Sequence, residues 1–170
     1  TGLPAAGSIT QWSDTSGNAR HATEATNPPT VQDAALNGYD VARFDGTNDT
    51  LVLATGFTAQ PYSFAVVARD RTGVTPAYFW ARTGDGQCAL VKSNPSLFVI
   101  SSTNRVVGAM ATAFTDWFMA TVIVNGAASY GSLNGTAGSP GNAGSAHPTS
   151  VDLGSLVGAA WFPLDYAAVV

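Results

Sequence analysis

Short apolar segments recur along the whole chain, and turn-forming residues separate them at close intervals. They span residues 41–44, 50–53, 62–69, 77–81, 88–92, 97–101, 105–110, 117–124, 127–133, 151–157 and 164–170. In 62–69, Tyr62, Phe64, Val66 and Ala68 fall on one face, which is the period of a strand. Because no long segment shows a helical period, this pattern predicts an all-β fold. We expect an antiparallel β-sandwich of the jelly-roll type, with little or no helix.

Composition agrees with this fold class and with a single domain over residues 1–170. Only 11% of the residues are charged, with Glu24 the one glutamate and Lys92 the one lysine, so the residues that usually cover helix surfaces are scarce. Residues 1–40 are the least regular part, and we expect them to wrap the edge of the sandwich. The chain begins at Thr1 and ends in the apolar run Tyr166–Val170. We therefore expect it to belong to a longer polypeptide.

Two Asn-Gly pairs mark turns in the last third of the chain. Asn125-Gly126 lies between apolar segments and predicts a tight hairpin, because both residues tolerate positive φ. Asn134-Gly135 opens a Gly-, Ala- and Ser-rich stretch, residues 136–147, which predicts an uncharged surface loop.

Charge and hydropathy exclude two classes of partner. The formal net charge is −4 and the six arginines are scattered. Nucleic-acid binding needs clustered cations to displace counterions, so we expect none. No apolar stretch approaches the ~18 residues of a membrane span, so we expect no membrane insertion.

The N-terminal part carries a recognisable motif. Its residues are Trp12, Asp14, Gly17, Asn18 and His21, followed by Phe44, Asp45 and Gly46. This pattern resembles the opening of the laminin-G-like, concanavalin A-like lectin/glucanase jelly roll in its bacterial and phage versions. The tail 163–170 is similar to the closing strand of that family. The resemblance implies the sandwich fold, and it leaves function open, since the family spans lectins, adhesion modules, virion proteins and some glycosidases.

The motif residues themselves have a mainly structural interpretation. Trp12 and Phe44 are expected to anchor the core. Asp14 and Asn18 are short polar residues that bond nearby backbone groups, with Gly17 supplying a left-handed step. We interpret His21 as a packed or hydrogen-bonded structural histidine.

The sequence lacks the paired carboxylates that glycoside hydrolysis requires. Glycoside hydrolysis needs two carboxylates about 5–10 Å apart, and no strand carries an Asp-x-Asp or Glu-x-Asp pair. We therefore expect no enzyme activity and no resident cofactor. Asp45, Asn48 and Asp49 leave two interpretations open: an Asx-stabilised turn, which we favour, and a calcium site built from hard oxygen ligands.

Aromatic side chains are the usual platforms for sugar rings. The candidates are Tyr62, Tyr78, Trp80, Trp117, Tyr130 and Trp161. Trp80 and Trp117 lie in strand patterns that favour the core. We predict Trp161, Tyr130 and Tyr78 as ligand-contacting residues.

Two functional hypotheses follow, and a third, a glycoside hydrolase, is less supported. The first is a non-catalytic structural or adhesive module displayed on a virion, as a phage head, tail-fibre or decoration protein. The second is a carbohydrate-binding module of a bacterial secreted or surface protein. Either places the domain on a virion, outside a cell or at a cell surface. The expected partners are copies of itself, other virion or surface proteins, and cell-surface glycans.

Overall fold

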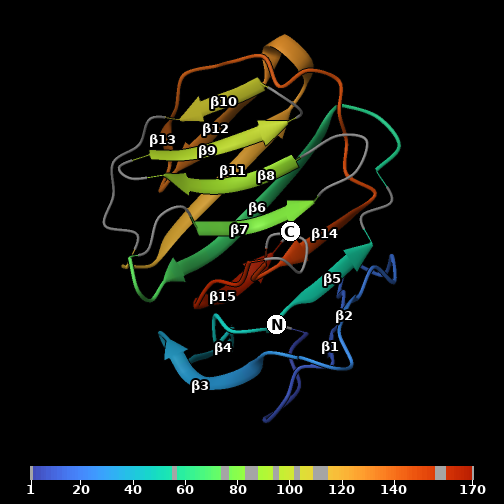
Figure 1. The fold of residues 1–170 in the computed structure, drawn as a ribbon, viewed down its shortest axis with the longest axis vertical. Helices are drawn as coiled ribbons and strands as arrows, with labels where there is room; N and C mark the ends of the chain where they lie inside the picture. The colour runs from blue at the N-terminus through green and yellow to red at the C-terminus, as the bar shows by residue number, and fades with distance from the viewer. Residues whose placement is uncertain are drawn as a thin grey trace.

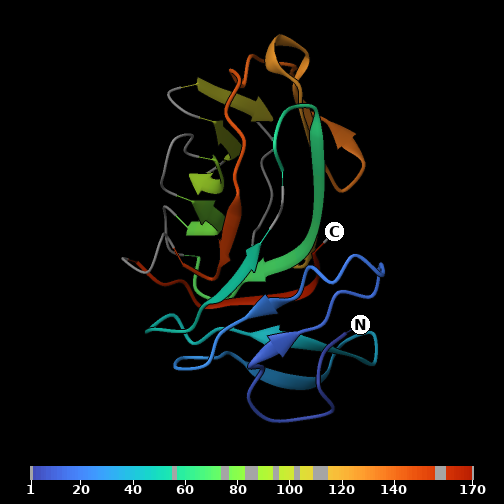
Figure 2. The same cartoon turned by 90° about the vertical axis from the view of Figure 1, so that its right-hand side faces the viewer.

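The fold is an antiparallel β-sandwich, which confirms the predicted fold class (Figure 1). The computed structural model describes residues 2–54, 57–73, 77–82, 88–93, 96–101, 104–108, 115–155 and 160–169. Every strand pairing in these residues is antiparallel, and their only helical element is the 3-10 turn η1 (Gly126–Ala128). Seen from the side, β7–β10 form part of one layer, and β6 and β12 part of the other (Figure 2).

The described strands form two sheets. The eight-stranded sheet has the order β1-β2-β5-β14-β7-β8-β9-β10, and the seven-stranded sheet has the order β13-β12-β11-β6-β15-β4-β3. The first contains β1 (Gln11–Trp12), β2 (Ala22–Thr23), β5 (Leu51–Ala54), β14 (Ser150–Leu153), β7 (Ala77–Arg82), β8 (Cys88–Ser93), β9 (Ser96–Ser101) and β10 (Asn104–Gly108). The second contains β13 (Thr136–Ala137), β12 (Tyr130–Leu133), β11 (Phe118–Val124), β6 (Tyr62–Asp70), β15 (Leu164–Val169), β4 (Tyr39–Arg43) and β3 (Thr30–Leu36).

The closing strand β15 is held between β4 and β6 by a buried charge. Asp165 is fully buried, and it lies opposite Arg43 on β4 and Arg69 on β6. Arg43 Nε lies 2.9 Å from its carboxylate, Arg69 Nη2 lies 2.8 Å away, and Arg71 Nε lies 3.5 Å away. The hydrogen bond to Asp165 raises the pKa of the Arg43 guanidinium. A buried carboxylate is costly unless it is paired, and three cations meet that need here.

An aromatic cluster fills the space between the sheets. Phe44 and Tyr166 are fully buried and meet edge to face, with ring centroids 5.2 Å apart. Phe79 and Phe118 form a second edge-to-face pair at 4.9 Å. The Tyr166 hydroxyl donates to the Phe79 carbonyl, and burial raises the pKa of that phenol. Tyr166 therefore links both pairs into one core.

The N-terminal segment lies at the edges of the sandwich, as its irregular sequence suggests. β1 and β3 are the end strands of the two sheets. The seven-residue strand β3 was not predicted. Its side chains are exposed or half-buried, so it shows no hydrophobic alternation, and its register with β4 shifts between Gln32 and Leu36.

The predicted hairpin at Asn125-Gly126 is confirmed, because β11 and β12 pair antiparallel as far as Ile123 and Tyr130, but its turn is longer than expected. Asn125 has φ −151°, and η1 follows, so no tight turn forms there and β12 begins only at Tyr130. A contact remote in sequence accompanies this longer turn, since the Gly126 amide donates to Gln60 Oε1 at 2.6 Å. The tight turn is Asn134-Gly135. Both residues have positive φ, and Leu133 pairs with Thr136, so the expected loop 136–147 begins as strand β13.

Gly154 is the glycine that the core needs most clearly, because its φ is +79° and a Cβ there would overlap the Phe44 ring. We expect Gly154→Ala to be more destabilising than Gly38→Ala, in which φ is +83° but nothing lies within 4 Å of the added Cβ. Both changes incur the left-handed backbone penalty of about 1–2 kcal/mol. Only Gly154→Ala adds the overpacking cost, about 1–3 kcal/mol. Thermal unfolding of the two variants measures the difference. Equal melting temperatures would contradict the packing of Phe44 on Gly154.

Candidate functional site

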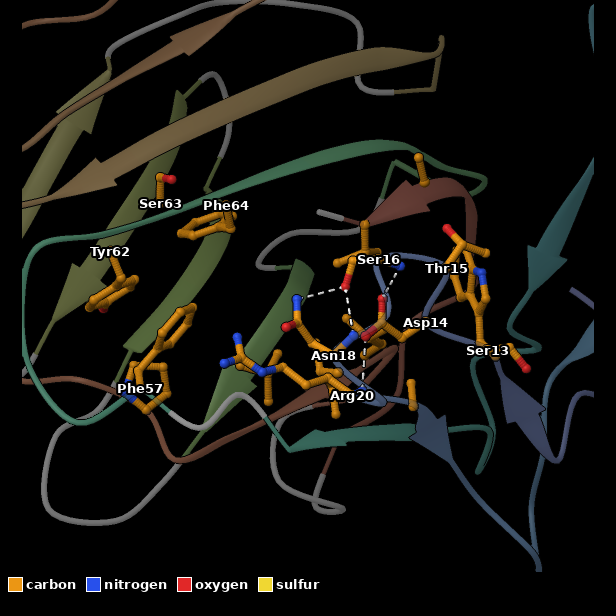
Figure 3. A pocket seen from close by; sticks show the side chains of 18 of the residues that line it. Ser13, Asp14, Thr15, Ser16, Asn18, Arg20, Phe57, Tyr62, Ser63 and Phe64 are labelled. Carbon is orange, nitrogen blue, oxygen red and sulfur yellow. Dashed lines mark hydrogen bonds between the residues drawn. The ribbon is translucent and has the colours of Figure 1, made fainter. Parts of the chain in front are cut away.

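A cavity of about 630 Å³ opens where the N-terminal loop 13–20 meets the ends of strands from both sheets (Figure 3). Its floor consists of core residues on β5 and β14, among them Leu53, Val151 and Leu153. The start of β6 and the end of β15 form a second wall, with Tyr62, Phe64 and Val169 among its residues. The volume lies within the range of about 300–1,000 Å³ that small-molecule sites occupy.

Asp14 organises the polar loop at the cavity. Its carboxylate accepts the Ser16 amide at 2.7 Å and the Arg20 amide at 3.0 Å. Its own amide donates to His21 Nδ1 at 2.9 Å. Asn18 donates its side-chain amide to Ser16 Oγ at 2.9 Å. The motif residues therefore form hydrogen bonds within the loop, and these bonds hold its conformation without a ligand.

These bonds hold Asp14 ionised over nearly the whole pH range. The Ser16 side chain acts most strongly, followed by the backbone amides of Arg20 and Ser16, and together they lower the pKa of Asp14 to about 2. The carboxylate is consequently an acceptor of structural hydrogen bonds. A proton donor for catalysis would need the opposite shift.

Aromatic rings line the side of the cavity away from this loop. Phe57 and Tyr62 stack with their ring centroids 4.7 Å apart and an interplanar angle of 22°. Phe64 follows Tyr62 on the same face of β6, whereas Trp12, directly before the loop, adds a ring from β1. In Figure 3 the labelled rings lie on one side and the polar loop residues on the other. The site thus presents flat apolar surface opposite hydrogen-bonding groups.

The lining is poor in charge. Among the lining residues that the structure describes, Asp14 carries the one carboxylate and Arg20 the one permanent cation. The described residues also include no group of three or more His, Cys, Asp or Glu side chains arranged to hold a metal ion. The arrangement suits reversible binding of a ligand with one apolar face and several hydroxyl groups.

The motif residues outside the loop form the core and a second turn. Trp12 is buried with 8% exposure and Phe44 is fully buried. Gly46 has φ +82° and lies against Pro163, where a Cβ would come within 2.7 Å of the Pro163 ring. The motif therefore builds the frame around the cavity.

Asp45, Asn48 and Asp49 lie in that second turn. Asp45 Oδ1 accepts the Thr47 and Asn48 amides at 2.7 and 3.3 Å, and Asp49 Oδ2 accepts the Asp45 amide at 2.8 Å. Partial burial acts to raise the pKa of Asp45, but these amides outweigh it and lower that pKa. Burial raises the pKa of Asp49. The hydrogen bonds are those of an Asx turn, and calcium binding at this turn stays a prediction.

The aromatic residues predicted from the sequence lie elsewhere or cannot be placed. Tyr130 is 45% exposed on β12, and Trp161 is half-buried in a bridge to Ser155. Neither belongs to the described lining of the cavity. The Tyr78 side chain, on β7, lies outside what the structure describes. Their contacts with a ligand stay predictions.

Sequence analysis missed Phe57, Phe64 and Arg20 as site residues. Tyr62 was among the aromatic candidates, and its alternation with Phe64 predicted only a shared strand face. No local signal places a loop residue near 20 beside a strand that begins at 62. That proximity comes from β5, which pairs with both β2 and β14 and so brings the N-terminal segment to the cavity.

Comparisons with known proteins agree on the fold. Domain 4 of AbnA, a GH43 extracellular arabinanase from Geobacillus stearothermophilus solved in complex with arabinotriose, matches with a TM-score of 0.58 and 17% identity, over 97% of this chain and 94% of that one. The binding domain of Paraclostridial Mosquitocidal Protein 1 matches with a TM-score of 0.64 and 12% sequence identity, over 96% of this chain and 47% of that one. Domains LG4-5 of the mouse laminin α1 chain match with a TM-score of 0.56 and 11% sequence identity, over 75% of this chain and 40% of that one.

The chain therefore has the laminin-G-like, concanavalin A-like sandwich fold that its motif indicated. It spans less than half the length of the laminin and mosquitocidal chains. No protein-family model and no curated protein sequence matches it.

Within the described residues, no helix has the length and apolar character needed to cross a membrane.

The low pKa of Asp14 leads to a measurable change with pH. Because the folded value, about 2, lies below the ordinary 3.8, Asp14 contributes stability above pH 3.8 and loses it as the pH falls through about 2. We expect Ser16→Ala to raise the pKa of Asp14 toward 3.8, since the Ser16 side chain is the largest cause of the shift. An NMR titration of the Asp14 carboxyl carbon measures both values. The control is Asp14→Asn, which should remove this part of the acid dependence. A wild-type value near 3.8 would show that the loop bonds do not form in solution.

Proposed function

We propose that this domain is a non-catalytic glycan-binding module of a secreted, surface or virion protein, and that the cavity beside loop 13–20 is its sugar site. The observation that carries the proposal is the stacked Phe57–Tyr62 pair facing a loop of hydrogen-bonding residues. A pyranose or furanose has an apolar face that packs on an aromatic ring and an edge of hydroxyl groups. The two sides of the cavity complement those two surfaces.

The rigidity of the polar side supports binding by a weakly interacting ligand. Ordering a loop on binding opposes affinity, and a loop already closed by Asp14 avoids that cost. Ser13 and Thr15 line the cavity, and their hydroxyl groups can donate to and accept from sugar hydroxyls.

One structural neighbour supports a sugar ligand. Domain 4 of AbnA shares the fold over nearly its whole length and was solved with arabinotriose. The parent enzyme is described as extracellular, which agrees with a secreted or surface location for this chain.

The hydrogen-bonding of the acidic residues supports a non-catalytic role. Carboxylates that bind backbone amides or arginines in the described structure are Asp14, Glu24, Asp40, Asp45, Asp49, Asp70 and Asp165. A glycosidase needs two carboxyl groups that flank one bond, and the described lining carries one. We infer that the module holds a glycan and leaves any cleavage to another domain.

Replacement of Phe57 by leucine tests the site. Phe57→Leu keeps an apolar side chain but removes the flat ring, so we expect up to about a tenfold loss of affinity. A glycan array identifies the ligand, and calorimetry measures the dissociation constant. Tyr130→Ala is the matched control, because Tyr130 is an exposed aromatic outside the cavity. Loss of affinity in Tyr130→Ala alone would move the sugar site to β12. Release of reducing sugar from the bound glycan would contradict the non-catalytic role.

Display in several copies is the further part of this proposal. Single sugar sites bind weakly, and linked copies gain about 10²–10⁴ in avidity. Residues 136–147 carry no charge, so little desolvation opposes their contact with a like copy or a neutral surface. We expect the intact protein to scatter light as an oligomer, on a virion or a cell surface. A monomeric intact protein would contradict display as the source of attachment.

A further inference from the structure

We propose that Arg20 makes the cavity selective for a sugar that carries a carboxylate, a uronic acid. This inference rests on the proposed glycan-binding function and names the class of ligand. Arg20 would bind the carboxylate while Phe57, which stacks on the buried Tyr62, contacts the ring.

Arg20 differs from the other arginines whose side chains the structure describes. Arg43, Arg69 and Arg71 all approach Asp165, and their charge is used to hold β15. The Arg20 guanidinium has no ion pair or hydrogen bond to any described residue, although Arg20 lines the cavity. In Figure 3 its side chain extends from the loop toward the side of the cavity where Phe57 lies. The fold itself therefore makes no use of this cation.

The backbone of Arg20 is nevertheless fixed. Its amide donates to Asp14 Oδ2 at 3.0 Å, and the next residue, His21, accepts the Asp14 amide. The preceding residue, Ala19, has φ +55°. An arginine with a fixed backbone and a free guanidinium can offer its fork of N–H groups to a carboxylate in two parallel hydrogen bonds.

Asp14 does not neutralise Arg20, although both line the cavity. The groups that lower the pKa of Asp14 are the Ser16 side chain, the amides of Arg20 and Ser16, and the charge of His21. Among the described residues, no ion pair joins the Arg20 guanidinium to the Asp14 carboxylate. The Asp14 carboxylate is turned to its own loop, which leaves the cation for a ligand.

The overall charge of −4 opposes an acidic ligand only weakly. Exposed charges more than about 8 Å apart are largely screened at physiological salt. A charge-assisted hydrogen bond in direct contact is screened much less and is stronger than a neutral one. We therefore expect contact with Arg20 to outweigh the repulsion from the remote acidic residues.

The test compares a trimer of galacturonic acid with the matching trimer of galactose, by calorimetry on the whole chain. The wild type should bind the acidic trimer more tightly, and added salt should weaken that preference. Arg20→Gln should lower affinity for the acidic trimer by about tenfold to a hundredfold and leave the neutral trimer unchanged. Arg20→Lys keeps the charge without the fork and should recover part of the loss. Arg105→Gln is the control, because it removes the same charge from β10, at the far end of the eight-stranded sheet.

Four other outcomes decide between this inference and the proposed function. Equal affinity of the wild type for the two trimers overturns the inference, and so does an equal loss in Arg20→Gln and Arg105→Gln. If the neutral trimer binds as tightly as the acidic one and Phe57→Leu weakens both, the proposed function stands without the selectivity. If the folded protein binds neither trimer and no glycan on an array, both fail.

Discussion

The buried carboxylate of Asp165 is the contact on which the rest of the sandwich depends. It joins residues far apart in the sequence, since Arg43 lies 122 positions before it and Arg69 lies 96 positions before it. Leaving a buried charge without its partner costs about 3–5 kcal/mol, a large share of the about 5–15 kcal/mol that stabilise a domain. The requirement for pairing therefore favours β15 between β4 and β6, with Asp165 opposite Arg43 and Arg69. Arg43 also donates to Gln32 at 2.6 Å, which extends the network to the edge strand β3.

Because side chains alternate between the two faces of β15, its position also decides which of its residues enter the core and which line the cavity. Asp165 faces the arginines, so Tyr166 faces inward, against Phe44 and the Phe79 carbonyl. The register between β15 and β6 shifts between Tyr166 and Ala168. The residues just after this bulge, together with the start of β6, line the cavity. The same strand thus closes the fold at one end and shapes the binding surface at the other.

The two sides of the cavity are held by different physical means. The aromatic side belongs to the sheet and is fixed by packing, with Tyr62 only 5% exposed. The polar side belongs to loop 13–20 and is fixed by hydrogen bonds to Asp14 and His21. A rigid frame that carries a pre-ordered loop binds a small ligand with little entropy lost on association. The guanidinium of Arg20 makes no ion pair or hydrogen bond with the described residues, and for that reason it is available to bind a ligand.

Sequence patterns determined the elements, and the tertiary structure decided how they meet. Alternation along 62–69, the turn residues and the motif from Trp12 to Gly46 were enough to predict the sandwich, because burial on one face and positive φ leave local marks. β3 escaped prediction because an exposed edge strand buries no face. Asn125-Gly126 correctly marked the hairpin of β11 and β12, but not its longer turn, where Gln60, remote in sequence, binds the Gly126 amide. The site could not be predicted for the same reason. Arg20 and Phe57 line one cavity only because strand pairing brings them together, and the energy of that pairing depends on residues far apart in the sequence.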